Sequence, residues 1–127
     1  MFPKSIDTDS YFQTYAFSGC SSLTSIEIPE GVARLFTFSF ANCTSLTTIT
    51  LPSTIQELGN PNAKPKSPFY GCDNLSCIKT KMKQPITITA DIFPNYYKSI
   101  LYVPEGCKAT YEVADYWNEF KEIIEIN

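Results

Sequence analysis

Histidine is missing altogether from this chain of 127 residues. Its absence removes the usual general base of serine and cysteine hydrolases, and with it the commonest metal ligand in proteins. Glycine is also scarce, and the five glycines form neither a phosphate-binding loop nor a dinucleotide fingerprint. We therefore predict that the chain is not an enzyme and that it holds no cofactor and no metal.

Positive charge and long apolar runs are scarce as well. The chain has a single arginine and a net charge of −3, so neither a phosphate backbone nor an anionic membrane finds a complementary surface. No apolar run approaches the length of a transmembrane helix. The first ten residues carry Lys4, Asp7 and Asp9 and do not resemble a signal peptide. These features predict no nucleic acid binding and no membrane insertion, and they show no signal peptide in this chain.

A repeat with a period of 23 residues is the strongest pattern that is present. Eight positions keep this spacing between the first two copies. They are Phe17, Cys20, Leu23, Ile26, Ile28, Pro29, Val32 and Leu35, followed by Phe40, Cys43, Leu46, Ile49, Leu51, Pro52, Ile55 and Leu58. A third copy supplies Phe69, Cys72, Leu75 and Ile78 after six extra residues enter within 59–68. Copies this short cannot enclose a core alone, so neighbouring copies must stack their apolar faces.

The repeat predicts a leucine-rich-repeat solenoid that is mainly β. Within one copy, Leu23, Ile26 and Ile28 point inward from a short strand that ends at Pro29, and successive copies add parallel strands. Val32 and Leu35 predict a short strand on the opposite wall. Towards the end of the chain, residues 108–116 favour a helix, so we expect a C-terminal helical cap. Trp117, Phe120 and Ile123 would continue the apolar stripe of that cap.

We predict a single leucine-rich-repeat domain over residues 1–127. Residues 1–15 form a partial repeat, and residues 16–80 hold the regular repeats with the insert at 59–68. Residues 81–104 form a degenerate coil, and residues 105–127 form the cap. The partial repeat would leave an uncapped N-terminal end, which leaves self-association through that end open.

The repeated motif resembles the BspA-type leucine-rich repeats, with Ala16 to Val32 carrying Ala-Phe-x-x-Cys-x-x-Leu-x-x-Ile-x-Ile-Pro-x-x-Val. The tail from Leu101 to Tyr111, followed by Trp117-x-x-Phe120, is similar to the closing segment of such proteins. Thr80 departs from the pattern, because Ile28 and Leu51 predict an apolar residue there. The resemblance implies a secreted or cell-surface protein that adheres to a host matrix protein or to a protein on another cell.

The cysteines follow the repeat rather than a metal-binding spacing. Cys20, Cys43 and Cys72 share one repeat position and should stack about 5 Å apart. No Cys-x-x-Cys pair occurs, so we interpret this column as buried packing rather than as a metal site or a disulfide. Cys77 falls in an outward register and Cys107 follows a glycine, so either of them is free to be exposed or paired.

The outward side of the predicted strands is the candidate partner-binding face, because parallel strands align side chains into a rigid patch. Its residues are small, polar and mixed in charge: Thr24, Ser25, Glu27, Thr47, Thr48, Thr50, Ser76 and Lys79. The leading hypothesis is a non-enzymatic protein-binding or adhesion module that uses this face. The alternative is a structural spacer or capping segment of a larger surface protein, with binding located upstream.

Overall fold

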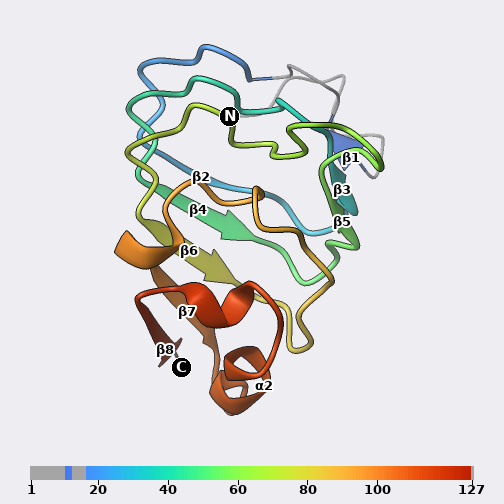
Figure 1. Cartoon of the computed structure of the whole chain (residues 1–127), viewed down its shortest axis with the longest axis vertical. Helices are drawn as coiled ribbons and strands as arrows, with labels where there is room; N and C mark the ends of the chain where they lie inside the picture. The colour runs from blue at the N-terminus through green and yellow to red at the C-terminus, as the bar shows by residue number, and fades with distance from the viewer. Residues whose placement is uncertain (1–10, 13–16, 127) are drawn as a thin grey trace.

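The computed structural model describes residues 11–12 and 17–126, and its strands form two parallel sheets (Figure 1). The larger one, the front sheet, has the order β2-β4-β6-β7-β8. Its strands are β2 (Ser25–Glu27), β4 (Thr48–Leu51), β6 (Cys77–Thr80), β7 (Ile100–Pro104) and β8 (Glu122–Ile126). The back sheet consists of β1 (Tyr11–Phe12), β3 (Arg34–Leu35) and β5 (Glu57–Leu58) in that order. This stacking of parallel strands fits the predicted repeat solenoid.

The core lies between the two sheets, and each coil contributes to it at the same positions. The register of the front sheet places one inward residue of every strand beside the next, and all of these residues are buried: Ile26, Ile49, Ile78, Leu101 and Ile123. Leu35 and Leu58 of the back sheet are buried as well. Burying one such side chain contributes about 1.5–3 kcal/mol, so the column is a large part of the folding free energy.

A second column of aromatic rings runs through the turns that connect the sheets. The Phe17 and Phe40 rings are stacked with centroids 5.1 Å apart, and Phe40 and Phe69 follow at 5.9 Å. Phe69 stacks on Phe93 at 5.5 Å, which carries the column into the irregular stretch after β6. The Trp117 ring then lies 5.6 Å from Phe93. One aromatic ring per coil therefore fills the turn side of the core.

The cysteine column joins successive coils by hydrogen bonds. The Cys43 thiol donates to the carbonyl of Phe17 at 3.1 Å, and the Cys72 thiol donates to that of Phe40 at 2.9 Å. A hydrogen bond with Cys43, together with burial, raises the pKa of the Cys72 thiol. All five cysteines are free. The buried thiols thus give the carbonyls of Phe17 and Phe40 a second donor, beside the amides of Cys20 and Cys43, and they link each coil to the preceding one.

Thr80 takes the inward position at which the repeat predicts an apolar residue, and it is buried. Its hydroxyl lies 3.3 Å from the Tyr111 hydroxyl and accepts the amide hydrogen of Met82 at 3.0 Å. Tyr111 in turn donates to the carbonyl of Met82 at 2.7 Å. The buried polar side chain is therefore satisfied by a partner that lies 31 residues further along the chain.

The predicted C-terminal helical cap is not confirmed. The helix α2 spans only Lys108–Glu112, and the 3-10 helix η2 spans Trp117–Glu119. Tyr116 between them has a φ of 68°, a left-handed conformation that ends the helical path. The chain then returns to the front sheet as β8, which pairs in parallel with all of β7. The apolar stripe was assigned to a helix because its residues recur every third position, but Ile123 reaches the core from a strand.

The C-terminal segment nevertheless covers the end of the core. Tyr111 and Trp117 are fully buried, and Phe120 is nearly so. Trp117 donates its indole hydrogen to the carbonyl of Ile86 at 2.8 Å. Two long-range hydrogen bonds, from Tyr111 and from Trp117, therefore fix this segment to the irregular stretch that follows β6. A further 3-10 helix, η1 (Tyr96–Lys98), leads from that stretch into β7.

Most of the predicted partial repeat at residues 1–15 lies outside the described residues. Of this segment the structure describes β1, which pairs with β3 through Tyr11 and Arg34. The self-association predicted for the uncapped N-terminal end concerns the same region and stays a prediction.

We expect the substitution Tyr111→Phe to lower the free energy of unfolding by about 1–3 kcal/mol, because it leaves the Met82 carbonyl without its buried donor. Urea denaturation followed by circular dichroism measures this change. Tyr97→Phe is the matched control, since the Tyr97 side chain is 70% exposed and no stability change is expected. An equal effect of both substitutions would contradict the role of the buried network.

The stability difference between the natural chain and Tyr111→Phe should depend on pH. Burial raises the pKa of Tyr111 to about 12, from an ordinary value of 10.0. The stabilisation of the neutral phenol is complete below about pH 10 and is lost as the pH rises to about 12, because the unfolded chain ionises first. The stability difference between the natural chain and Tyr111→Phe should therefore shrink over this window, and a constant difference would contradict it.

Cys77 should be the most reactive thiol of the folded chain. It is half-buried on the outward side of β6, whereas Cys43, Cys72 and Cys107 are buried and therefore inaccessible to a reagent. Cys20 is also half-buried, but burial raises the pKa of its thiol and so lowers its reactivity. With an aromatic disulfide reagent, Cys77→Ser should remove the fastest phase of absorbance change, while Cys107→Ser should retain it. A fast phase that survives Cys77→Ser would contradict the placement of Cys77.

Candidate functional site

The outward side of the front sheet is formed by two columns of side chains that cross all five strands. The strand registers align Ser25, Thr48, Cys77, Ile100 and Glu122 in the first column. They align Glu27, Thr50, Lys79, Tyr102 and Ile124 in the second. Because neighbouring strands lie about 4.8 Å apart, each column is a straight and evenly spaced row. We call this surface the lateral face.

All eight residues predicted for partner binding lie on or beside the first three strands of the lateral face. Five of them are exposed: Thr24, Ser25, Glu27, Thr47 and Ser76. Thr48, Thr50 and Lys79 are half-buried between neighbouring strands. Backbone hydrogen bonds from Thr47 to Thr24, at 2.8 Å, and from Ser76 to Thr47, at 3.0 Å, hold the three strand starts together. The structure thus brings the predicted residues into one surface.

The sequence analysis missed the four residues that β7 and β8 add to the lateral face, and all of them except Glu122 differ in character from the predicted residues. Ile100, Tyr102 and Ile124 are half-buried apolar or aromatic side chains on β7 and β8. The signal was present, because Ile78 and Leu101 pair in register and are again 23 residues apart. Residues 81–104 had been interpreted as a degenerate coil, so the columns were not extended across them. The lateral face therefore changes from polar at β2 to mixed at β7 and β8, where apolar side chains lie beside Glu122.

Charges on the lateral face are few and partly paired. Lys81 follows β6, and its ammonium lies 2.8 Å from the carboxylate of Glu27, which raises the pKa of Lys81. Both side chains are at least half exposed, so this pair adds little stability. The Lys79 ammonium lies 5.9 Å from the centre of the Tyr102 ring, within cation–π range. In the second column, the Lys79 side chain therefore lies over the ring of its neighbour Tyr102.

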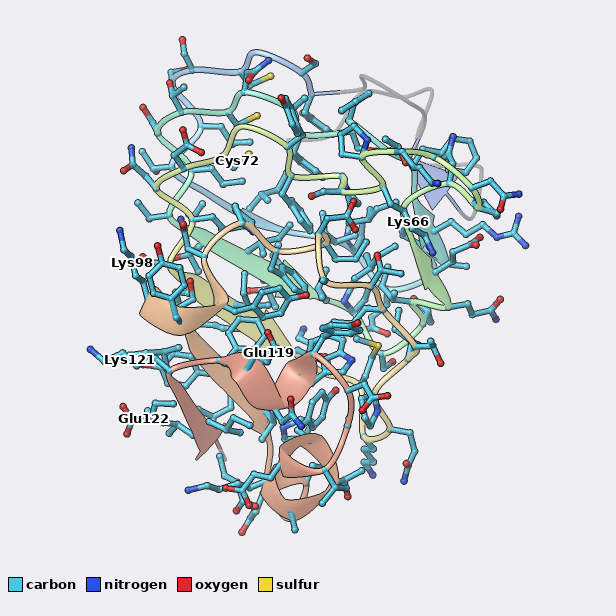
Figure 2. All side chains as sticks on the ribbon, viewed as in Figure 1. Lys66, Cys72, Lys98, Glu119, Lys121 and Glu122 are labelled. Atoms are coloured by element: carbon cyan, nitrogen blue, oxygen red, sulfur yellow. The ribbon has the colours of Figure 1, made fainter. Side chains whose placement is uncertain are left out.

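Further charges lie on or beside the β7 and β8 end of the lateral face, where Glu122 belongs to the first column. Lys98 of η1, Lys121 and Glu122 lie along the same side of the molecule, whereas Lys66 lies on the opposite side (Figure 2). Tyr97 is 70% exposed, and the Lys98 ammonium lies 5.5 Å from the centre of its ring. Apolar and aromatic side chains beside charged and polar ones are a usual composition of a protein interface.

Among residues 11–12 and 17–126, no group of three or more cysteines or carboxylates is arranged to hold a metal ion. No helix within the same residues is long and apolar enough to cross a membrane.

Comparison with known protein families identifies the repeat. A model described as BspA type leucine rich repeat region matches residues 10–114 in six copies. Comparisons with curated proteins and with solved structures found no match. The family match covers most of the chain, including β1 to β7 and α2. The chain therefore belongs to the BspA-type leucine-rich repeat family.

Proposed function

We propose that this chain is a non-enzymatic module that binds a protein partner through the lateral face of its front sheet. Membership of a leucine-rich repeat family supports this proposal, since stacked repeats commonly form extended binding surfaces. The observation that carries it is the continuity of the two outward columns across five parallel strands.

Ile100, Tyr102 and Ile124 are the proposed anchors of binding. Aromatic and apolar side chains near the centre of an interface account for most binding energy, while polar residues at the rim contribute little. Tyr102 also keeps its hydroxyl for a hydrogen bond, which suits a surface that must stay soluble when it is unbound. The polar residues predicted from the sequence, such as Thr24 and Ser25, then form the rim towards β2.

We further propose that the partner is a host matrix protein or a cell-surface protein, and that this chain is secreted or displayed on a cell surface. The support is the family resemblance alone, because a fold does not fix a function. Residues 1–127 act as one domain in this proposal, with residues 105–127 as the segment that closes the stack.

The anchor residues can be tested by binding of the purified chain to a panel of immobilised extracellular matrix proteins. We expect saturable binding to at least one of them, and Tyr102→Ala should weaken it by about 2 kcal/mol, or roughly thirtyfold. Thr24→Ala at the rim should change binding by less than about threefold. Surface plasmon resonance measures all three affinities.

Tyr70→Ala is the matched control. Tyr70 is a 52% exposed tyrosine that lies in a turn and packs against Phe38 with ring centroids 5.6 Å apart, and it belongs to neither column of the lateral face. If Tyr70→Ala weakens binding as much as Tyr102→Ala does, the lateral face is not the site. Thermal unfolding of each variant separates lost binding from lost folding.

A structural spacer or closing segment of a larger surface protein is the second candidate. The buried rings of Tyr111 and Trp117, which cover the end of the core, favour it. Absence of saturable binding by this chain, together with binding by a longer parent protein, would decide for the spacer and against the proposed binding module.

A further inference from the structure

The back of the molecule has a groove where the regular stacking of coils is interrupted. The back sheet ends at β5, which pairs with β3 on one side only. The following coil passes this point as residues 85–88, which form no strand. Within the described residues, the other edge of β5 thus has no neighbouring strand. An open strand edge presents backbone donors and acceptors to an added chain.

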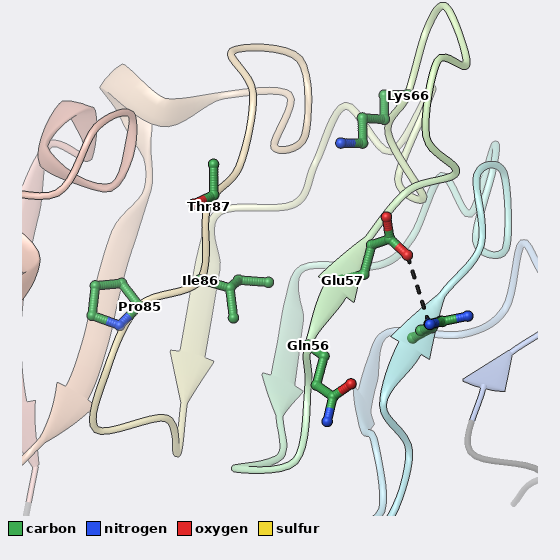
Figure 3. A pocket seen from close by; sticks show the side chains of 7 residues that line it. Gln56, Glu57, Lys66, Pro85, Ile86 and Thr87 are labelled. Atoms are coloured by element: carbon green, nitrogen blue, oxygen red, sulfur yellow. Dashed lines mark ion pairs between the residues drawn. The ribbon is translucent and has the colours of Figure 1, made fainter.

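A cavity of about 560 Å³ separates β5 from this segment (Figure 3). Arg34, Gln56 and Glu57 line it from the back sheet, and Pro85, Ile86 and Thr87 line it from the next coil. Lys66 closes the third side from the insert at residues 59–68. This volume lies within the range of ligand-binding clefts, and its lining is mainly polar.

The insert holds Lys66 in place through its backbone. The Lys66 amide donates to the carboxylate of Asp91 at 2.7 Å, and the Lys66 carbonyl accepts the hydroxyl of Thr37 at 2.8 Å. Gly59, with a φ of 85°, lies so close to the Lys66 carbonyl that a Cβ atom would collide with it. The Cγ of Lys66 also lies against Gly59, and the charge of Lys66 helps to lower the pKa of Asp91. From this anchored stem the Lys66 ammonium extends over the groove (Figure 3).

Two cationic groups of the groove are available to a ligand. The Arg34 Nε lies 3.6 Å from the Glu57 carboxylate, a distance beyond a good hydrogen bond, and the side chain is 55% exposed. Among the residues that the structure describes, Glu57 is the one carboxylate within ion-pair distance of Arg34, and the contact uses Nε, which leaves the terminal nitrogens for a planar two-point contact with a ligand carboxylate. In the described part of the chain, no carboxylate lies within ion-pair distance of the Lys66 ammonium.

We infer that this groove binds an extended acidic peptide segment. The backbone of the peptide runs along the open edge of β5, and one of its carboxylates is held between Arg34 and Lys66. Gln56 and Thr87 supply neutral hydrogen-bonding groups on either side of the peptide. This site lies on the back of the coils and is independent of the lateral face, so it adds a second recognition surface to the chain.

The test uses the full chain labelled with nitrogen-15 and an eight-residue peptide of alternating threonine and glutamate. We expect saturable shifts of the amide resonances of residues 56–58 and 85–88, with no shifts on the lateral face. A peptide of alternating threonine and lysine should cause none. Lys66→Glu and Arg34→Gln should each weaken binding by about tenfold or more, as loss of a charge-assisted hydrogen bond does.

Lys121→Glu is the control, because it makes the same change of charge on the opposite side of the molecule (Figure 2). The inference is overturned if the acidic peptide causes no saturable shifts, or if Lys121→Glu weakens binding as much as Lys66→Glu. It is equally overturned if an oligomer of uronic acid binds the groove while the acidic peptide does not, since the groove would then recognise a glycan.

Discussion

Contact between neighbouring coils is the constraint on which the whole structure depends. One coil supplies only a few inward side chains, and none is covered until the next coil places its own beside them. Ile49 is buried because Ile26 and Ile78 flank it in the register of the front sheet. The same register aligns the outward side chains, so the stability of the core and the geometry of the lateral face have one origin.

The repeat spacing predicted the inner columns of the core, but it could not predict contacts between residues outside equivalent repeat positions. Phe40, Cys43 and Ile49 lie where the period places them, because burial at these positions depends on the adjacent copy alone. The burial of Thr80 depends on Tyr111, 31 residues away, and no local pattern reports such a pair. The C-terminal helix was overestimated for a related reason, because pairing with β7 drew residues 122–126 into the front sheet.

The lateral face was predicted only in part, and the reason is again one of register. The outward columns predicted from the sequence ended at Ser76 and Lys79, since the stretch after Thr80 breaks the repeat pattern. In the structure that stretch forms an irregular coil that still contributes Ile92 and Phe93 to the core, and β7 then resumes the register with Tyr102 beside Lys79. The interruption has a second consequence on the back of the molecule, where the displaced coil leaves the edge of β5 open and forms the groove beside Lys66. One irregular coil thus extends one surface and creates another.

The central claim is that the front sheet continues unbroken to β8, so that Ile124 belongs to the same surface as Tyr102. Native-state hydrogen exchange of the amides of residues 122–126, followed by nuclear magnetic resonance, tests it most directly. Parallel pairing with β7 predicts that the paired amides of β8 exchange as slowly as those of β6. Exchange at the rate of exposed loops throughout residues 122–126 would show that the sheet ends at β7 and would contradict the account.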